Sequence, residues 1–161
     1  QFKAEEGRES LRRVLIAHCR RNPHLGYTQS LNFVAAFLLL QTPEQGAIRG
    51  GFGREETSFW LLCVLTEKVL PDYFTSLLKG VQTDTLVLEQ LANQTPELAP
   101  VASHLSDLGI ELGFVSTQWF MLCFVNALPA ETALRVWDLL FAFGARTLIA
   151  VALALLRLKS E

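Results

Sequence analysis

The chain has 161 residues; half of them are hydrophobic, 19% are charged, and the formal net charge is −2. A chain of this length and apolar content buries about two-thirds of the surface that its unfolded form exposes, which fits one folded domain and excludes an intrinsically disordered protein. The small net charge gives the molecule as a whole no electrostatic basis for binding nucleic acid.

The first 25 residues are the most basic part of the chain, with six basic and three acidic side chains. Ser10 is a candidate cap for a first helix in which Val14 and His18 share an apolar face, and Asn22-Pro23 ends this helix. The helix also carries four arginines that make its outer surface basic: Arg12, Arg13, Arg20 and Arg21. A solvated surface is the favoured interpretation of these arginines, and contact with an acidic partner is the alternative.

Proline and glycine punctuate the rest of the chain, and the apolar spacing between these breaks is helical. It predicts helices over residues 28–40, 55–70, 72–78, 83–91, 96–105, 116–128, 131–143 and 146–159. The segment 116–128 is apolar nearly all round, so we expect it at the centre of the core. No run alternates as a β-strand does. We therefore predict an all-α fold of about eight or nine helices around one apolar core, without a β-sheet.

The cysteines and the apolar runs indicate where the protein works. Cys19, Cys63 and Cys123 are far apart and lack the spacing of a zinc site, so we expect buried free thiols, a reducing compartment and no metal. The longest apolar run, residues 148–156, is too short to cross a bilayer, which takes about 20 residues. The polar N-terminus is unlike a secretory signal. A cytoplasmic protein without an integral membrane segment is expected.

Three further features have a structural rather than a functional interpretation. The loop 46–56 contains four glycines, but it matches neither a P-loop nor a dinucleotide-binding turn, so we interpret it as a connection. Glu55 and Glu56 suit the start of a helix through its dipole. Asp138 lies between two apolar residues, which predicts a buried carboxylate paired with a side chain such as Arg135.

Uncharged polar side chains crowd the start of the predicted helix 28–40. Thr28 or Ser30 is a candidate cap, and Asn32 is placed to satisfy backbone groups of the loop, which leaves Gln29 without a structural role. A glutamine amide both donates and accepts hydrogen bonds, so it can orient a water beside a phosphate oxygen, as in GTP hydrolysis. On the residues alone, an ordinary surface glutamine remains the more frequent explanation.

The stretch GYTQSLNFVAAFLLL resembles the Tyr-x-Gln-Gly-Met-Asn motif of TBC domains, the GTPase-activating modules for Rab proteins. The preceding LRRVLIAHCRRNPHLGY is similar to the lead-in of this motif. Three later blocks, EETSFWLLCVLTEKVLPDYF, STQWFMLCFVNALP and LRVWDLLFAFG, resemble the family's later blocks and follow in the same order. The resemblance extends from about Ser10 to Lys159.

The resemblance implies an all-α domain that acts in vesicle trafficking by accelerating GTP hydrolysis on a GTP-bound Rab-type small GTPase. By position, Gln29 is the glutamine finger supplied in trans, while Tyr27, Asn32 and Gly26 support the turn that carries it. Such a protein completes its partner's active site and is not an independent enzyme. It needs no cofactor of its own, because the GTPase binds GTP and Mg²⁺. Recruitment to membranes through the GTPase is expected to be transient.

The family's second finger is an arginine in an upstream Ile-x-x-Asp-x-x-Arg segment, which this sequence lacks. Residues 1–10 resemble the loop after that segment, so Arg8 is not a candidate, and we expect residues 1–161 to form an N-terminally incomplete part of one TBC-like domain. Thr28, Ser30 and Leu31 also stand where the family usually has Cys, Gly and Met. The alternative is therefore a weakly active or inactive TBC-like module that binds small GTPases or other partners without stimulating hydrolysis.

Overall fold

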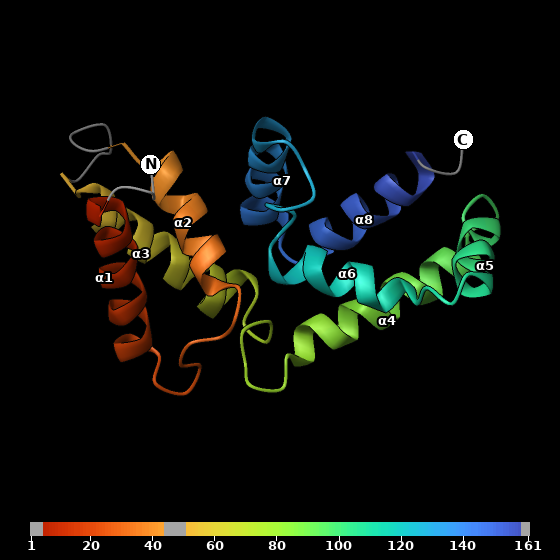
Figure 1. Cartoon of the computed structure of the whole chain (residues 1–161), viewed down its shortest axis with the longest axis horizontal. Helices are drawn as coiled ribbons and strands as arrows, with labels where there is room; N and C mark the ends of the chain where they lie inside the picture. The colour runs from red at the N-terminus through yellow and green to blue at the C-terminus, as the bar shows by residue number, and fades with distance from the viewer. Residues whose placement is uncertain (1–4, 44–50, 159–161) are drawn as a thin grey trace. The chain divides into compact units, whose positions relative to one another are not determined.

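The computed structural model describes residues 5–43 and 51–158, and the chain falls into two compact units, residues 1–77 and 78–161. Within the described ranges there are eight α-helices and one π-helical turn, and no β-strand (Figure 1). The predicted all-α fold of eight or nine helices is therefore confirmed.

The first unit contains α1 (Glu5–Arg21), α2 (Leu31–Gln41), α3 (Arg54–Val64) and the π-turn η1 (Leu65–Val69). Helices α1, α2 and α3 pack against one another pairwise, and η1 continues α3 without a break (Figure 1). Apolar side chains of all four elements are buried, among them Val14, Leu31, Val34, Leu38, Leu62 and Leu65. The predicted helices 28–40 and 55–70 correspond to α2 and to α3 with η1.

The second unit contains α4 (Lys79–Gln94), α5 (Ala99–Asp107), α6 (Leu112–Met121), α7 (Ala130–Phe143) and α8 (Arg146–Leu158). Helix α4 packs against α5, α6 and α8, and α7 packs against α8. Its buried core includes Leu88, Phe120, Phe124, Leu140, Leu148 and Ala152. The predicted boundaries of α7 and α8 are confirmed within one residue, and α7 ends before Gly144, whose φ of 78° is easily adopted without a Cβ.

Helix α1 begins earlier than its apolar spacing predicts. It starts at Glu5, so the interpretation of the first ten residues as a loop is wrong for residues 5–10, and Ser10 is not a cap. No breaker precedes Pro23 except Gly7, and the carboxylates of Glu5 and Glu6 suit the positive end of the helix dipole. The Ser10 hydroxyl instead donates a hydrogen bond to Glu55 on α3, at 2.8 Å.

The predicted helix 116–128 is wrong at both ends. Helix α6 runs from Leu112 to Met121 and then reverses through Cys123 and Phe124, whose φ angles are 46° and 63°. The Phe124 amide donates to the Trp119 carbonyl at 2.9 Å, as in the wide closing bond of a Schellman helix end. Cys123 and Phe124 are fully buried, so their apolar character reflects a buried turn rather than a helix.

The segment that joins the two units is also less helical than predicted. Residues 72–77 form turns, α4 begins at Lys79 rather than at residue 83, and its preceding residue Leu78 has a φ of 49°. In the described ranges, no helix combines the length and apolar character that a membrane crossing requires.

Candidate functional site: the turn before helix α2

The polar residues that precede α2 belong to a tight turn, residues 22–30, which starts directly after α1. The Asn22 carbonyl accepts hydrogen bonds from the amides of Leu25 and Gly26, both at 3.0 Å. Gly26 has a φ of 63°, in the left-handed region that glycine enters without strain. The chain direction therefore reverses here, as the Asn-Pro and Gly signals predict.

The end of the turn is fixed to a distant segment of the same unit. The Thr28 hydroxyl donates to the Phe74 carbonyl at 2.7 Å, across 46 residues of sequence. Helix α2 starts only at Leu31, and no side-chain hydrogen bond caps it, so the predicted capping by Thr28 or Ser30 is wrong. Ser30 is buried and has a φ of 96°, a conformation that non-glycine residues rarely adopt.

Gln29 lies in this turn, before α2 rather than in its first helical turn, and its side chain is exposed. Among the described residues, its amide has no hydrogen-bond partner. Nearby, the Tyr27 hydroxyl donates to Asn32 Oδ1 at 3.3 Å, which links the last part of the turn to the first turn of α2. Tyr27 is itself 58% exposed. The side chains of Tyr27 and Gln29 are therefore exposed, whereas the backbone that carries them is held by the contact between Thr28 and Phe74.

The C-terminal end of α1 is joined to η1 by three polar contacts. Arg21 donates to Glu67 through Nε at 2.8 Å and through Nη2 at 3.2 Å, and the Asn22 side-chain amide donates to Glu67 Oε1 at 3.0 Å. One turn earlier on α1, His18 Nε2 lies 2.9 Å from Thr66 Oγ1. Because the Thr66 hydroxyl donates to the Leu62 carbonyl, it accepts the proton of His18 Nε2.

These contacts and burial shift the pKa values of Glu67, His18 and Cys63. The hydrogen bonds from Arg21 and then from Asn22 lower the pKa of Glu67 to about 2, so this carboxylate stays ionised at neutral pH. Burial lowers the pKa of His18, which keeps its imidazole neutral. Burial also raises the pKa of the Cys63 thiol to about 11. Cys63 is therefore a poor nucleophile at neutral pH.

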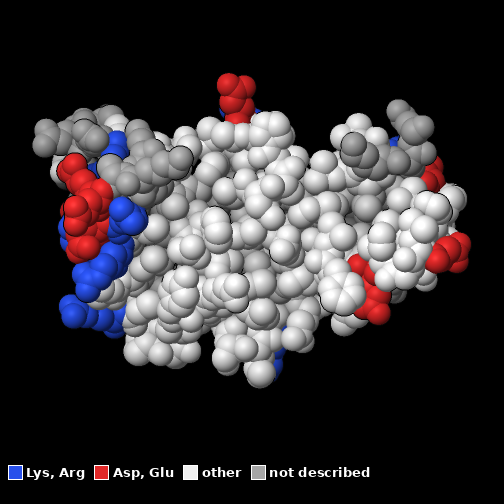
Figure 2. All heavy atoms as spheres, viewed as in Figure 1, with Lys and Arg blue, Asp and Glu red and all other residues white. Residues whose placement is uncertain are grey.

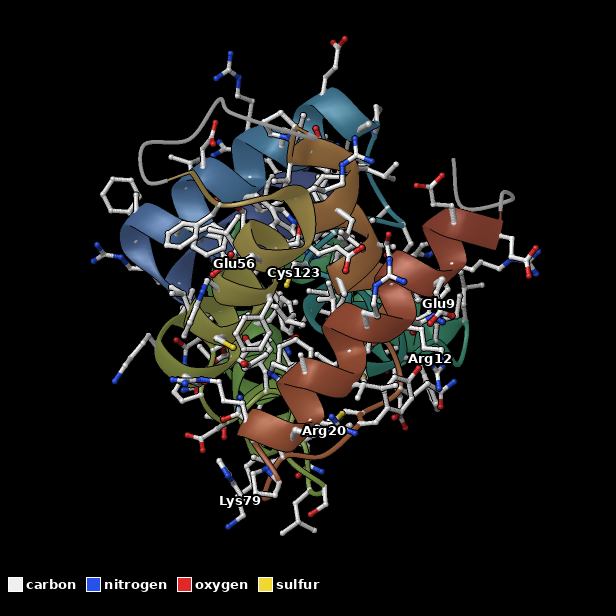
Figure 3. All side chains as sticks on the ribbon, turned by 90° about the vertical axis from the view of Figure 1, so that its left-hand side faces the viewer. Glu9, Arg12, Arg20, Glu56, Lys79 and Cys123 are labelled. Carbon is white, nitrogen blue, oxygen red and sulfur yellow. The ribbon has the colours of Figure 1, made fainter. Side chains whose placement is uncertain are left out.

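The basic surface of α1 is largely paired with acidic side chains. Arg13 binds Glu55 through Nε at 2.8 Å and Nη2 at 2.6 Å, and Arg12 binds Glu9 at 3.1 Å. Figure 2 shows blue and red side chains side by side at the left edge, over α1, and Figure 3 shows Glu9 and Arg12 next to each other on this helix. Glu55 thus has a partner on another helix, a role beyond the predicted dipole effect.

The cysteines and Asp138 agree only in part with their predicted burial. The three cysteines are free; Cys63 and Cys123 are buried, as predicted, whereas Cys19 is only half-buried. Asp138 lies 3.5 Å from Arg135, the predicted partner, but its side chain is 70% exposed, so the predicted burial is wrong. In residues 5–43 and 51–158, no group of three or more His, Cys, Asp or Glu side chains is arranged to hold a metal. Residues 46–50 of the predicted loop lie outside the described residues, and residues 54–56 already belong to α3.

Two groups that hold the turn have no signal in the sequence. Glu67 stands in the unremarkable stretch Leu-Thr-Glu-Lys-Val, and the Phe74 group in question is a backbone carbonyl, which any residue supplies. Only the tertiary structure brings these groups to Asn22 and Thr28.

The chain shares this all-α fold with a known family of proteins. The whole chain, residues 1–161, matches the family model described as the Rab-GTPase-TBC domain, so the chain belongs to the TBC-domain family. The expected family membership is thereby confirmed.

Individual relatives agree with this assignment. The chain is 38% identical over 149 residues to growth hormone-regulated TBC protein 1-A of Danio rerio, covering 92% of this chain and 38% of that protein. It is 37% identical to human growth hormone-regulated TBC protein 1, covering 94% of this chain and 42% of that protein. A crystal structure of the Chlamydomonas flagellar RabGAP TBC domain superposes with a TM-score of 0.78 at 28% identity, covering 96% of this chain and 47% of that one. The chain thus spans less than half the length of these relatives.

Proposed function

We propose that this chain stimulates GTP hydrolysis by a Rab-type small GTPase and that Gln29 enters the partner's active site to orient the attacking water at the γ-phosphate. The observation that carries the proposal is the placement of Gln29. Its side-chain amide is exposed and has no partner among the described residues. The residue before it, Thr28, is hydrogen-bonded to the Phe74 carbonyl, and the residue after it, Ser30, is buried. Membership of the Rab-GTPase-TBC family supports the same function.

The chemistry of the amide suits this role. The Gln29 Oε1 accepts a hydrogen bond from the attacking water, and its Nε2 donates one to a γ-phosphate oxygen. Such positioning accelerates the reaction only if the amide arrives in a defined direction. The Thr28 hydroxyl on one side and the buried Ser30 on the other restrict the backbone of Gln29. The hydrogen bond from Tyr27 to Asn32 joins the turn to the first turn of α2. The left-handed conformation of Gly26 lets the chain reverse its direction.

In this proposal, GTP and Mg²⁺ belong to the GTPase, and this chain completes the partner's active site without a cofactor. The protein reaches membranes and vesicles from the cytoplasm, transiently, by binding its GTPase. No arginine of this chain is assigned to the γ-phosphate, because the Ile-x-x-Asp-x-x-Arg motif has no match in the sequence.

The test is a single-turnover hydrolysis assay of a panel of purified, GTP-loaded Rab proteins with the full-length protein. We expect at least one Rab to hydrolyse GTP about 10²-fold faster or more in its presence. Tight binding to a GTP-loaded Rab whose hydrolysis stays at the intrinsic rate would contradict the proposal and favour a binding module. The absence of both binding and stimulation across the panel would contradict both functions.

A further inference from the structure

Residues 65–74 contact both ends of the turn that carries Gln29. At the start of the turn, Glu67 accepts hydrogen bonds from Arg21 and Asn22 at 2.8–3.2 Å. At its end, the Phe74 carbonyl accepts the Thr28 hydroxyl at 2.7 Å. The turn is therefore attached to residues 65–74 at two points, once where the chain leaves α1 and once shortly before α2 begins.

The start of the turn is held by the stronger of these contacts. Two parallel N–H bonds from a guanidinium to a carboxylate are charge-assisted and fix the relative orientation of the two groups. Asn22 is 4% exposed, so its amide needs a partner inside the protein, and Glu67 supplies it. The guanidinium of Arg21 also lies 5.1 Å from the centroid of the Trp60 ring, which packs it from a further side.

The π-turn itself places Glu67. The Leu70 amide reaches back five residues to the Leu65 carbonyl at 2.7 Å, which is the hydrogen bond of a π-helix. In this turn Thr66 and Glu67, although consecutive, both contact α1, at His18 and at Arg21. Such turns are rare and often occur at functional sites. Here the turn anchors the exit from α1.

We propose that Glu67 and Thr28 are positioning residues for Gln29, because together they fix the turn to residues 65–74 and set the direction of the Gln29 side chain. This inference rests on the proposed function. Displacing a catalytic group by about 1 Å costs about 10²-fold in rate, so partial loosening of the turn lowers the rate of the bound complex. Binding of the GTPase, which involves a larger surface, changes little.

A second carboxylate of the unit provides a matched control. Glu55 on α3 accepts two hydrogen bonds from Arg13 and one from Ser10, at 2.6–2.8 Å. Its surroundings therefore resemble those of Glu67: each carboxylate binds two nitrogens of a guanidinium on α1 and one neutral donor, which is Ser10 on α1 for Glu55 and Asn22, directly after α1, for Glu67. Neither Arg13 nor Ser10 adjoins the turn. Glu55→Gln thus removes a comparable ion pair without touching the anchor of Gln29.

The experiment compares Glu67→Gln, Thr28→Val and Glu55→Gln in the full-length protein, with two readouts. The first is hydrogen exchange of the Gly26 and Leu31 amides, which close the turn by bonding to Asn22 and Thr28. The second is single-turnover hydrolysis by a Rab that the wild-type protein stimulates. We expect Glu67→Gln and Thr28→Val to speed this exchange about tenfold and to lower the maximal rate about tenfold, with the half-saturating concentration unchanged. Thr28→Ser, which keeps the hydroxyl, restores both, and Glu55→Gln alters neither.

Each other outcome has a definite meaning. Unchanged exchange in both turn variants, an equal effect of Glu55→Gln, or faster exchange with wild-type hydrolysis overturns the positioning role. Thr28→Val carries the test if Glu67→Gln does not fold, because it replaces one hydroxyl group with a methyl group of similar size. A fully active Gln29→Ala variant overturns the proposed function instead, and this result is independent of how the exchange responds.

Discussion

His18 on α1 and Thr66 on the π-turn η1 form a buried hydrogen bond, with 2.9 Å between Nε2 and Oγ1. The imidazole is fully buried, and its Nδ1 has no hydrogen-bond partner in the described part of the chain. Protonation would place an unpaired N–H and a positive charge in this interior. An imidazolium would keep the Nε2 donor, so it is the buried, unpaired Nδ1, and not the contact with Thr66, that requires a neutral imidazole.

This requirement predicts how stability depends on pH. The pKa of His18 is lowered in the folded protein, so the unfolded chain binds the extra proton first as the pH falls below about 6.5. Stability from the neutral imidazole is complete above that pH and is lost below it, with a slope of up to about 1.4 kcal/mol per pH unit. His18→Leu should remove this slope just below pH 6.5 in urea unfolding. An unchanged slope in the variant would show that His18 is not the group that titrates.

The ion pair of Glu67 predicts a second, separate pH window. Because its pKa is about 2 in the folded protein, against an ordinary value of 4.5, its contribution is present above pH 4.5 and is lost as the pH falls towards 2. The thermal midpoint of Glu67→Gln should therefore lie below that of the wild type at pH 7, with a difference that shrinks as the pH is lowered from 4.5. Calorimetry across pH 7 to 3 measures this. A difference that stays constant over this range would show that Glu67 does not act through its charge.

The backbone conformation of Ser30 predicts that stability depends strongly on the shape of the side chain at this position. Its φ of 96° is accessible to glycine but costly for a β-branched residue. Ser30→Val should destabilise the protein by about 1–3 kcal/mol, whereas Ser30→Gly should change its stability little, since relief of strain offsets the freer unfolded chain. Urea unfolding of the two variants provides the comparison. Equal losses would mean that the serine hydroxyl, and not the backbone conformation, dominates.

In the second unit, the reversal after α6 depends on Trp137. Its indole Nε1 donates to the Cys123 carbonyl at 3.0 Å, inside the core and beside two residues with positive φ. Trp137→Phe keeps an aromatic ring but leaves this buried carbonyl without its donor, which should cost about 1–3 kcal/mol. Phe141→Leu, on the same helix but without such a bond, serves as a comparison. A loss of stability no larger in Trp137→Phe than in this comparison would contradict the role of the hydrogen bond.

The parts of the fold that were predicted correctly are those that local signals specify. Gly144 ends α7, and Thr42-Pro43 follows the end of α2, as expected from the punctuation of the sequence. The reversal at Cys123 and Phe124 was missed because apolar residues fill a buried turn as readily as a buried helix. The start of α1 was missed because its first turn carries no apolar face.

The same distinction holds for the site. The sequence alone singles out Gln29 and brings Tyr27 and Asn32 to the same turn, because these residues are neighbours. The anchors at Glu67 and Phe74 are tertiary contacts across more than 40 residues, with no local signal. Asp138 shows the opposite error, because apolar neighbours in sequence do not bury a side chain that points outwards from a helix.

The most direct test of the central claim is the effect of Gln29→Ala on GTP hydrolysis by a Rab that the wild-type full-length protein stimulates. The control is Gln41→Ala, which truncates an exposed glutamine at the other end of α2. We predict that Gln29→Ala lowers the maximal single-turnover rate by about 10²–10³-fold, while the thermal midpoint and the activity of the control stay as in the wild type. Stimulation by a folded Gln29→Ala variant at the wild-type rate would contradict the claim.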